Sequence, residues 1–204
     1  MAFPGSLSYL CICLSDVIFM EGLMRKIYSS LSSLEVLHLI GTFEMAAEEE
    51  EEIYEFFGGE NCKILTCTSV PQLTALEDQY IMSVPWEDST ICELDISSTE
   101  LSSECLEYFL SRIPGFTYLA AAHTDFFNDS VLKHLVDAKK FEELKALDLS
   151  FCPSLTEAAV VSFLTIHGKN LKGLMLNGNP VLAEYFWTTA IPFLPNIQYV
   201  MIIF

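Results

Sequence analysis

The feature that most constrains this fold is a pattern of apolar residues that recurs along the chain at a near-constant spacing. Its clearest form is Leu144-x-x-Leu147-x-Leu149-x-x-Cys152, and a second copy begins 27 residues later at Leu171. The template also fits segments that begin at Leu7, Leu34, Cys62, Ile91, Phe116 and Ile197. Successive starts are 27, 28, 29, 25, 28, 27 and 26 residues apart. These eight units predict a single repeat domain over residues 1–204.

Each unit opens with a short strand, because alternate side chains of a strand share one face. The fourth and sixth positions of a unit should therefore point inward together. The fourth positions are Leu10, Leu37, Leu65, Leu94, Leu119, Leu147, Leu174 and Val200. The sixth positions are Ile12, Leu39, Cys67, Ile96, Ala121, Leu149, Leu176 and Ile202. We expect eight parallel strands in which Leu94, Leu119, Leu147 and Leu174 form one continuous inward row.

The ninth position of each unit is where the chain should turn away from its strand. A small polar side chain there can bond exposed backbone groups. The residues at this position are Ser15, Thr42, Thr99, Thr124, Cys152 and Asn179, and the third unit departs with Val70. The run from Asn177 to Pro180 has the same turn chemistry and does not resemble a nucleotide site.

Between the strands the apolar spacing becomes helical. One stripe contains Leu106, Phe109, Leu110 and Ile113, and another contains Val131, Leu132, Leu135 and Val136. Ser130 and Thr156 are candidate helix N-caps. The predicted fold class is α/β: a right-handed solenoid or horseshoe with parallel strands on its concave face and helices on its convex face.

The segment from Leu144 to Asn179, with its Leu-Asp-Leu-Ser-x-Cys-Pro-x-Leu-Thr run at residues 147–156, resembles the cysteine-containing leucine-rich repeats of F-box proteins and their ribonuclease-inhibitor-like relatives. In F-box members, the resemblance implies a substrate receptor of a cullin-type ubiquitin ligase. The sequence departs from those members because its first strand already begins at Leu7, which leaves no F-box-like helical segment. A second group of cullin-ligase receptors with such repeats fits equally well.

The net charge restricts the classes of binding partner, and the cysteine content indicates the cellular compartment. The formal net charge of −18 argues against nucleic acid or an anionic membrane as a partner and allows a basic protein surface. The seven cysteines are odd in number and scattered, which predicts reduced thiols in an intracellular protein, cytoplasmic or nuclear. No apolar stretch approaches the length of a membrane span, and the first twenty residues have no basic region typical of a secretory signal.

No residue set predicts catalysis, a metal site or a cofactor. Cys11 and Cys13 lack a second cysteine or histidine pair at zinc spacing, and we expect Cys62 and Cys67 to be small core residues. The four histidines, which are His38, His123, His134 and His167, lie in different units without a nucleophile motif. We therefore predict that this chain is not an enzyme.

Two other groups have both a structural and a functional interpretation. The acidic run Glu48–Glu52, followed by four apolar residues, is either the exposed start of a convex helix or a docking patch for a basic partner. The aromatic residues Phe126, Phe127, Tyr185, Phe186 and Trp187 are expected to be core and hydrophobic-staple residues rather than an aromatic cage.

The fifth and seventh strand positions should face outward on the concave side, where the core does not fix their identity. They include His38, Thr66, Asp95, Ser97, Asp148, Ser150, Met175 and Asn177, which we take as the candidate partner-binding residues. Two aspartates among small polar residues predict a mildly acidic strip. The alternative is that such strand positions are simply polar.

These observations predict a protein-interaction module, in the form of the substrate-recognition part of a cullin-type ubiquitin-ligase receptor. Cullin-ligase components would then bind through regions outside this chain. The alternative is a non-catalytic scaffold or stoichiometric inhibitor with no ligase link. The uncharged segment Tyr199–Phe204 would make an open sheet edge, so we expect the chain to be part of a longer protein, or a partner or second copy to cover its ends.

Overall fold

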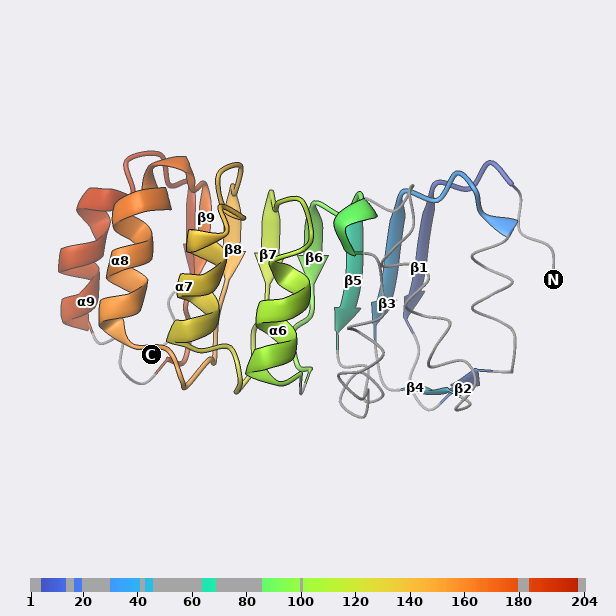
Figure 1. The fold of residues 1–204 in the computed structure, drawn as a ribbon, viewed down its shortest axis with the longest axis horizontal. Helices are drawn as coiled ribbons and strands as arrows, with labels where there is room; N and C mark the ends of the chain where they lie inside the picture. The colour runs from blue at the N-terminus through green and yellow to red at the C-terminus, as the bar shows by residue number, and fades with distance from the viewer. Residues whose placement is uncertain are drawn as a thin grey trace.

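The structure is a computed structural model that describes residues 5–13, 17–19, 30–40, 43–45, 64–68, 86–99, 101–179 and 184–201. Within these ranges, eight strands form one sheet in the order β1-β3-β5-β6-β7-β8-β9-β10, and every neighbouring pair is parallel (Figure 1). The strands are β1 (Tyr9–Cys13), β3 (Val36–Ile40), β5 (Ile64–Thr68), β6 (Glu93–Asp95), β7 (Tyr118–Ala120), β8 (Ala146–Asp148), β9 (Gly173–Met175) and β10 (Tyr199–Met201). The eight predicted parallel strands are confirmed.

The pairing register confirms the inward row. Leu94 pairs with Leu119, Leu119 with Leu147, and Leu147 with Leu174, and all four side chains are buried. The same register continues through Leu65, Leu37 and Leu10 on one side and Val200 on the other. A constant repeat length places each leucine directly beside the next, so the core runs the length of the sheet.

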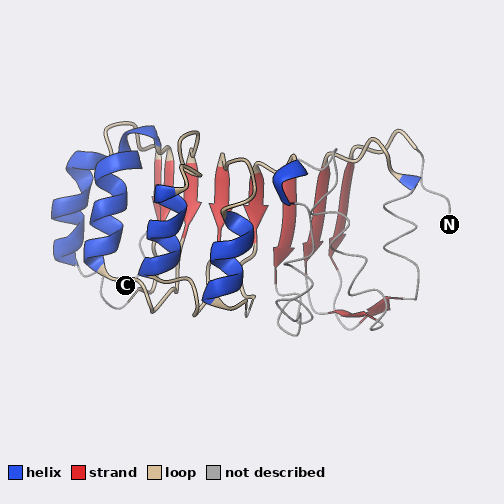
Figure 2. Ribbon diagram, viewed as in Figure 1, coloured by secondary structure: helices blue, strands red, loops and turns tan. Residues whose placement is uncertain are grey.

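Among the described residues, four α-helices lie along one face of the sheet (Figure 2). They are α6 (Ser103–Leu110), α7 (Asp129–Asp137), α8 (Glu157–His167) and α9 (Glu184–Ala190). The short 3-10 helices η1 (Trp86–Asp88), η2 (Gly168–Asn170) and η3 (Ile191–Phe193) lie in the connections. Both predicted apolar stripes face the core, and only Val136 is half-buried. No helix in the described part of the chain has the length and apolar character needed to cross a bilayer.

One of the two predicted helix caps is confirmed and the other is wrong. Thr156 is the N-cap of α8, and its Oγ1 accepts a hydrogen bond from the backbone N–H of Ala159. The N-cap of α7 is Asn128, whose Oδ1 accepts from the N–H groups of Ser130 and Val131. Ser130 already lies in the first turn. The sequence permits either residue, but only the asparagine lies where the chain enters the helix.

A second, two-stranded parallel sheet was not predicted. It consists of β2 (Val17–Phe19) and β4 (Phe43–Met45), which follow β1 and β3 by a few residues. Both strands lie at the same place in their units, so the parallel stacking that pairs β1 with β3 also brings β2 beside β4. The repeat template ends at position nine and contains no signal for this pairing.

The ninth positions bond backbone groups, as predicted. Asn179 Oδ1 accepts from the N–H of Cys152 at 2.7 Å, and its Nδ2 donates to the carbonyls of Leu149 and Leu176 at 2.8 and 3.3 Å. Thr99 Oγ1 donates to the carbonyl of Ile96, and Cys152 Sγ donates to that of Ala121. Ser15, Thr42 and Val70 lie outside the described residues.

The aromatic predictions hold in part. Phe127, Phe186 and Trp187 are buried, whereas Phe126 and Tyr185 are 47% and 73% exposed, so the core assignment is wrong for these two. Each exposed ring directly precedes a buried one, and the local backbone directs only one of the two side chains inward. Glu48–Glu52 and Cys62 lie outside the described residues, as does the side chain of Cys67. No disulfide joins the cysteines whose side chains are described, which are Cys11, Cys92, Cys105 and Cys152.

Candidate functional site

The sheet face opposite the helices, here called the open face, carries the third and fifth positions of each unit. Pairing places the fifth positions in one row, which contains Cys11, His38, Thr66, Asp95, Ala120, Asp148, Met175 and Met201. Five of the eight candidate residues therefore lie in a single row. His38, Asp95, Asp148 and Met175 are half-buried, and the side chain of Thr66 is not among those described.

The other three candidates occupy seventh positions, and their surroundings differ from the sequence expectation. Ser150 and Asn177 are only 4% and 6% exposed, and Ser97 is half-buried. Ser150 Oγ accepts from both the backbone N–H and the Nδ2 of Asn177, at 3.1 and 3.2 Å. The expectation that the fold does not need these side chains is therefore wrong. The hydroxyls of Ser97 and Ser150 each accept a backbone hydrogen bond from the neighbouring unit, beyond the ends of the strands.

The two aspartates of the row occupy equivalent surroundings. The Oδ1 of Asp95 accepts from the N–H of Ser97 at 3.0 Å, and that of Asp148 accepts from the N–H of Ser150 at 2.9 Å. Burial raises the pKa of Asp95 above its ordinary value of 3.8, and Asp148 adds to this rise, while the hydrogen bonds from Ser97 and the nearby His38 lower it. The carboxylate of Asp148 therefore acts on that of Asp95 across the single strand between them.

That intervening strand contributes small residues and one tyrosine. Ala120 lies between Asp95 and Asp148 in the row, and Tyr118 lies on the same face at the third position. The pKa of Tyr118 is raised to about 12, first by burial and then by the carboxylates of Asp95, Asp148 and Glu93 in that order. Three carboxylates thus act on one phenol, so the centre of the open face has a negative potential that favours a cation.

Sequence reasoning missed Tyr118 and Glu93. Both occupy the third template position, which alternates with the inward fourth position and so faces the same way as the fifth. The alternation of side chains along a strand already indicates this, but the prediction used the fifth and seventh positions and left out the third. Glu93 and Tyr118 lie half-buried on the open face within their strands, whereas the seventh position lies where the chain starts to turn.

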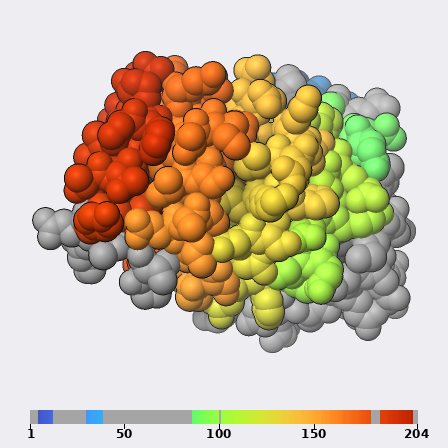
Figure 3. Space-filling model, turned by 60° about the vertical axis from the view of Figure 1, so that its left-hand side comes forward, coloured from blue at the N-terminus to red at the C-terminus, as the bar shows by residue number. Residues whose placement is uncertain are grey.

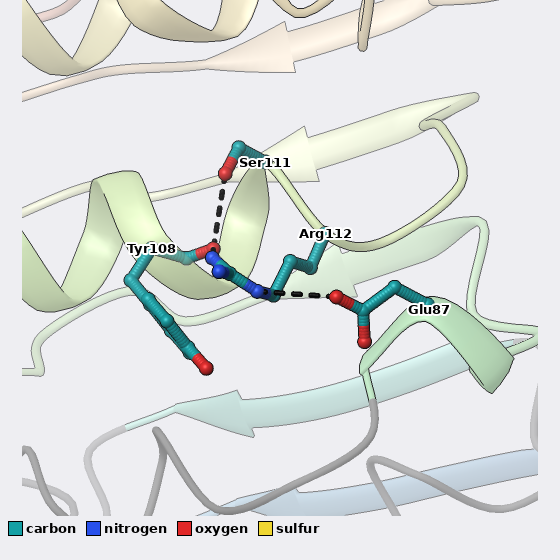
Figure 4. Close-up of polar contacts among 4 residues, drawn as sticks. All are labelled: Glu87, Tyr108, Ser111 and Arg112. Carbon is teal, nitrogen blue, oxygen red and sulfur yellow. Dashed lines mark hydrogen bonds and ion pairs between the residues drawn. The ribbon is translucent and has the colours of Figure 1, made fainter.

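A second polar cluster, away from the open face, surrounds Arg112. Arg112 stacks on the ring of Tyr108 at 3.5 Å, donates to the Tyr108 carbonyl, and pairs with Glu87 at 3.1 Å (Figure 4). Ser111 donates to the same carbonyl, so this cluster joins η1 to the end of α6. Among the described residues, no group of three or more His, Cys, Asp or Glu side chains is arranged to hold a metal ion.

Among the buried polar side chains that the structure describes, His167 has an atom without a hydrogen-bond partner. Its Nε2 has no hydrogen-bond partner, and its ring packs between Phe141 and Phe163. Burial lowers the pKa of His167 below its ordinary value of 6.5, and Glu142 opposes this effect. The imidazole is therefore neutral at pH 7 and acts as a core ring.

The helix face has a cavity of about 330 Å³ between α7 and α8, whose side chains lie next to each other in Figure 3. Leu132, Val136, Ala159 and Phe163 supply its apolar lining, and Lys133 and Asp137 at its margin form an ion pair with each other at 2.6 Å. No candidate residue from the sequence lies there.

Parallel strands that alternate with helices in stacked units define the leucine-rich-repeat fold. No protein-family model and no curated protein matches the sequence. A chain of the yeast Rad7–Elc1 complex superposes with a TM-score of 0.59 at 14% identity, over 86% of this chain and 52% of that one. This chain therefore spans about half the length of that protein, and the likeness shows the shared fold.

Two further solved structures are similar to a lesser degree. The C-terminal domain of tropomodulin from Caenorhabditis elegans has a TM-score of 0.49 at 15% identity, over 63% of this chain and 84% of that chain. The structure of the TLR13–ssRNA13 complex has a TM-score of 0.42 at 14% identity, over 96% of this chain and 30% of that chain.

Proposed function

We propose that this protein is a non-catalytic protein-interaction module whose open face binds a partner with a basic surface. The observation that carries this proposal is the arrangement of Asp95, Asp148 and Glu93 around Tyr118 on the sheet face that the described helices leave uncovered. Carboxylates that are held by backbone hydrogen bonds keep their positions without a partner, and an opposite charge would relieve their mutual repulsion.

We further propose that the module recognises substrates for a cullin-type ubiquitin ligase. The support is the resemblance of the segment from Leu147 to Thr156 to the repeats of F-box receptors, together with the leucine-rich-repeat fold. The ligase machinery would contact regions outside this chain. A pulldown from cell lysate separates this role from that of a scaffold or inhibitor: recovery of a cullin or its adaptor supports the ligase role, and a single stable partner without them contradicts it.

The binding face is tested by reversing its charge. The double variant Asp95→Lys with Asp148→Lys should keep the circular dichroism spectrum of the original protein. It should lower the binding affinity for a recovered basic partner roughly tenfold or more. The original interaction should also weaken steeply with salt, because exposed charges are screened.

The matched control is Glu142→Lys with Glu143→Lys, which makes the same change in net charge at two exposed residues before β8. This control should leave the affinity nearly unchanged. Equal weakening by both double variants would show that total charge, and not the open face, attracts the partner.

A further inference from the structure

Two aromatic rings form an exposed stack at the ends of the strands. The rings of His123 and Phe151 lie nearly parallel, with centroids 4.2 Å apart and an interplanar angle of 10°. Both residues are exposed, and Phe151 retains 41% of its surface. They occupy the eighth position of adjacent units, just beyond β7 and β8. We call this pair the aromatic shelf.

The backbone at the shelf has a conformation that disfavours large side chains. The eighth positions Ser98, His123, Phe151 and Gly178 have φ angles of 60°, 56°, 55° and 63°. A bulky residue rarely adopts this left-handed region, whereas glycine does so readily. A Cβ on Gly178 would lie 2.2 Å from the Phe151 ring, so that ring lies over the glycine. The same turn can therefore be made by glycine, and two successive units nevertheless carry rings.

The charge around the shelf is of one sign. The segments that leave the strands, 96–102, 121–128, 149–156 and 176–183, contain no lysine or arginine. Six of the seven described cations lie in the segments that enter the strands, namely Arg112, Lys139, Lys140, Lys145, Lys169 and Lys172. Burial raises the pKa of the Cys152 thiol, and the carboxylates of Asp148 and Asp125 raise it as well; Cys152 directly follows Phe151. The loops that bear the shelf therefore present carboxylates and rings without a competing cation.

We propose that the aromatic shelf docks an arginine side chain of the partner protein, which stacks its guanidinium on the outer face of His123. This inference rests on the proposed function, since it specifies how that partner is recognised. The face of the His123 ring that points away from Phe151 is its outer face. The preceding unit has Ser98 at the equivalent position, and a serine is too short to cover an imidazole. Asp125 and Asp148 supply the opposite charge. Arginine fits better than lysine because its planar cation stacks on a ring, whereas an ammonium group remains strongly hydrated.

A structural role and a recognition role of the aromatic shelf predict different effects on the melting temperature. If the rings served only the fold, replacing Phe151 with glycine would lower the melting temperature. If they serve recognition, Phe151→Gly relieves the left-handed strain and the melting temperature stays the same or rises. His123→Asn is the second variant, because asparagine tolerates this backbone conformation and removes the stacking face directly.

The test uses two peptides of equal charge, acetyl-Gly-Arg-Gly-Gly-Arg-Gly-amide and its lysine counterpart, titrated into the isotope-labelled protein by NMR. The original protein should bind the arginine peptide about two- to fivefold more tightly than the lysine peptide, which is the range expected for one exposed cation–π contact. Phe151→Gly and His123→Asn should bring this ratio close to one. Tyr185→Ala removes an exposed ring elsewhere and should leave the ratio unchanged.

The charge variant separates this inference from the proposed function. Asp95→Lys with Asp148→Lys should weaken both peptides. If the original protein binds the two peptides with nearly equal affinity, or if His123→Asn keeps the preference for arginine, the proposed stacking on the aromatic shelf is wrong. The proposal of a basic partner is then unaffected. Retained arginine preference with no effect of the charge variant overturns both the open-face site and the role of Asp148 at the shelf; the stack on His123 then stands with Asp125 alone supplying the opposite charge. Binding of neither peptide overturns both.

Discussion

At the scale of single residues, the ninth position shows how one side chain can join two repeat units. Asn179 bonds the backbone of its own unit at Leu176 and that of the preceding unit at Leu149 and Cys152. These backbone groups are buried after the strands have ended, so the sheet ladder does not satisfy them. An asparagine has both a donor and an acceptor and can satisfy both kinds of group at once.

We predict that Asn179→Ala lowers the free energy of unfolding by about 2–4 kcal/mol, because it removes the hydrogen bonds of a buried N–H group and of two buried carbonyls. Urea denaturation followed by circular dichroism measures this loss. Thr124→Val is the control at the same position of another unit, where the hydroxyl makes one long bond of 3.5 Å to Ala122. It should cost below about 1 kcal/mol. Equal losses would show that the ninth position contributes by packing alone.

At the scale of elements, α7 shows how a helix start is tied to its neighbour. Asn128 caps α7 and also donates from Nδ2 to the Ser103 hydroxyl in the first turn of α6. Asp129 accepts from the N–H and hydroxyl of Thr156, which caps α8. The starts of three successive helices are therefore joined by hydrogen bonds that run from unit to unit.

We predict that Asn128→Ala destabilises the protein by about 1–2 kcal/mol, because two N–H groups of α7 lose their acceptor. Ser130→Ala should cost less than about 0.5 kcal/mol, since the bond from Ser130 to Glu107 is exposed to water. Thermal unfolding of both variants against the original protein measures the difference. A larger loss for Ser130→Ala would restore the cap assignment made from the sequence.

At the scale of the whole molecule, each unit buries its apolar face only against its neighbours. Leu119 has a strand on each side and is fully buried. Val200 occupies the equivalent position in β10, which pairs within the described residues only with β9, and it remains 36% exposed. The same template position thus contributes differently according to the number of neighbouring strands.

We predict that Leu119→Ala lowers the free energy of unfolding by about 2–5 kcal/mol, because the removal of a fully buried side chain leaves a cavity. Val200→Ala should cost about 1 kcal/mol or less, since its side chain is already partly in water. Chemical denaturation of both variants tests this contrast. Comparable losses would mean that β10 is covered in solution, for example by a second copy of the chain.

The sequence by itself determined the strand positions, the inward leucine row and the turn chemistry of the ninth position. Periods of two and of about 27 residues are properties of the chain, and parallel stacking reproduces them directly. This is why Leu94, Leu119, Leu147 and Leu174 could be aligned in advance. The predicted row of Asp95 and Asp148 followed from the same alternation.

Only the tertiary structure decided which outward positions stay accessible and which residues cap the helices. Ser150 and Asn177 are buried because the chain turns immediately after them and the two residues bond each other across adjacent units, a contact that no local pattern records. Asn128 and Ser130 are both acceptable caps locally, and the path into α7 selects one. The stack of His123 on Phe151 likewise requires two left-handed turns in adjacent units, which bring together rings that are 28 residues apart in the sequence.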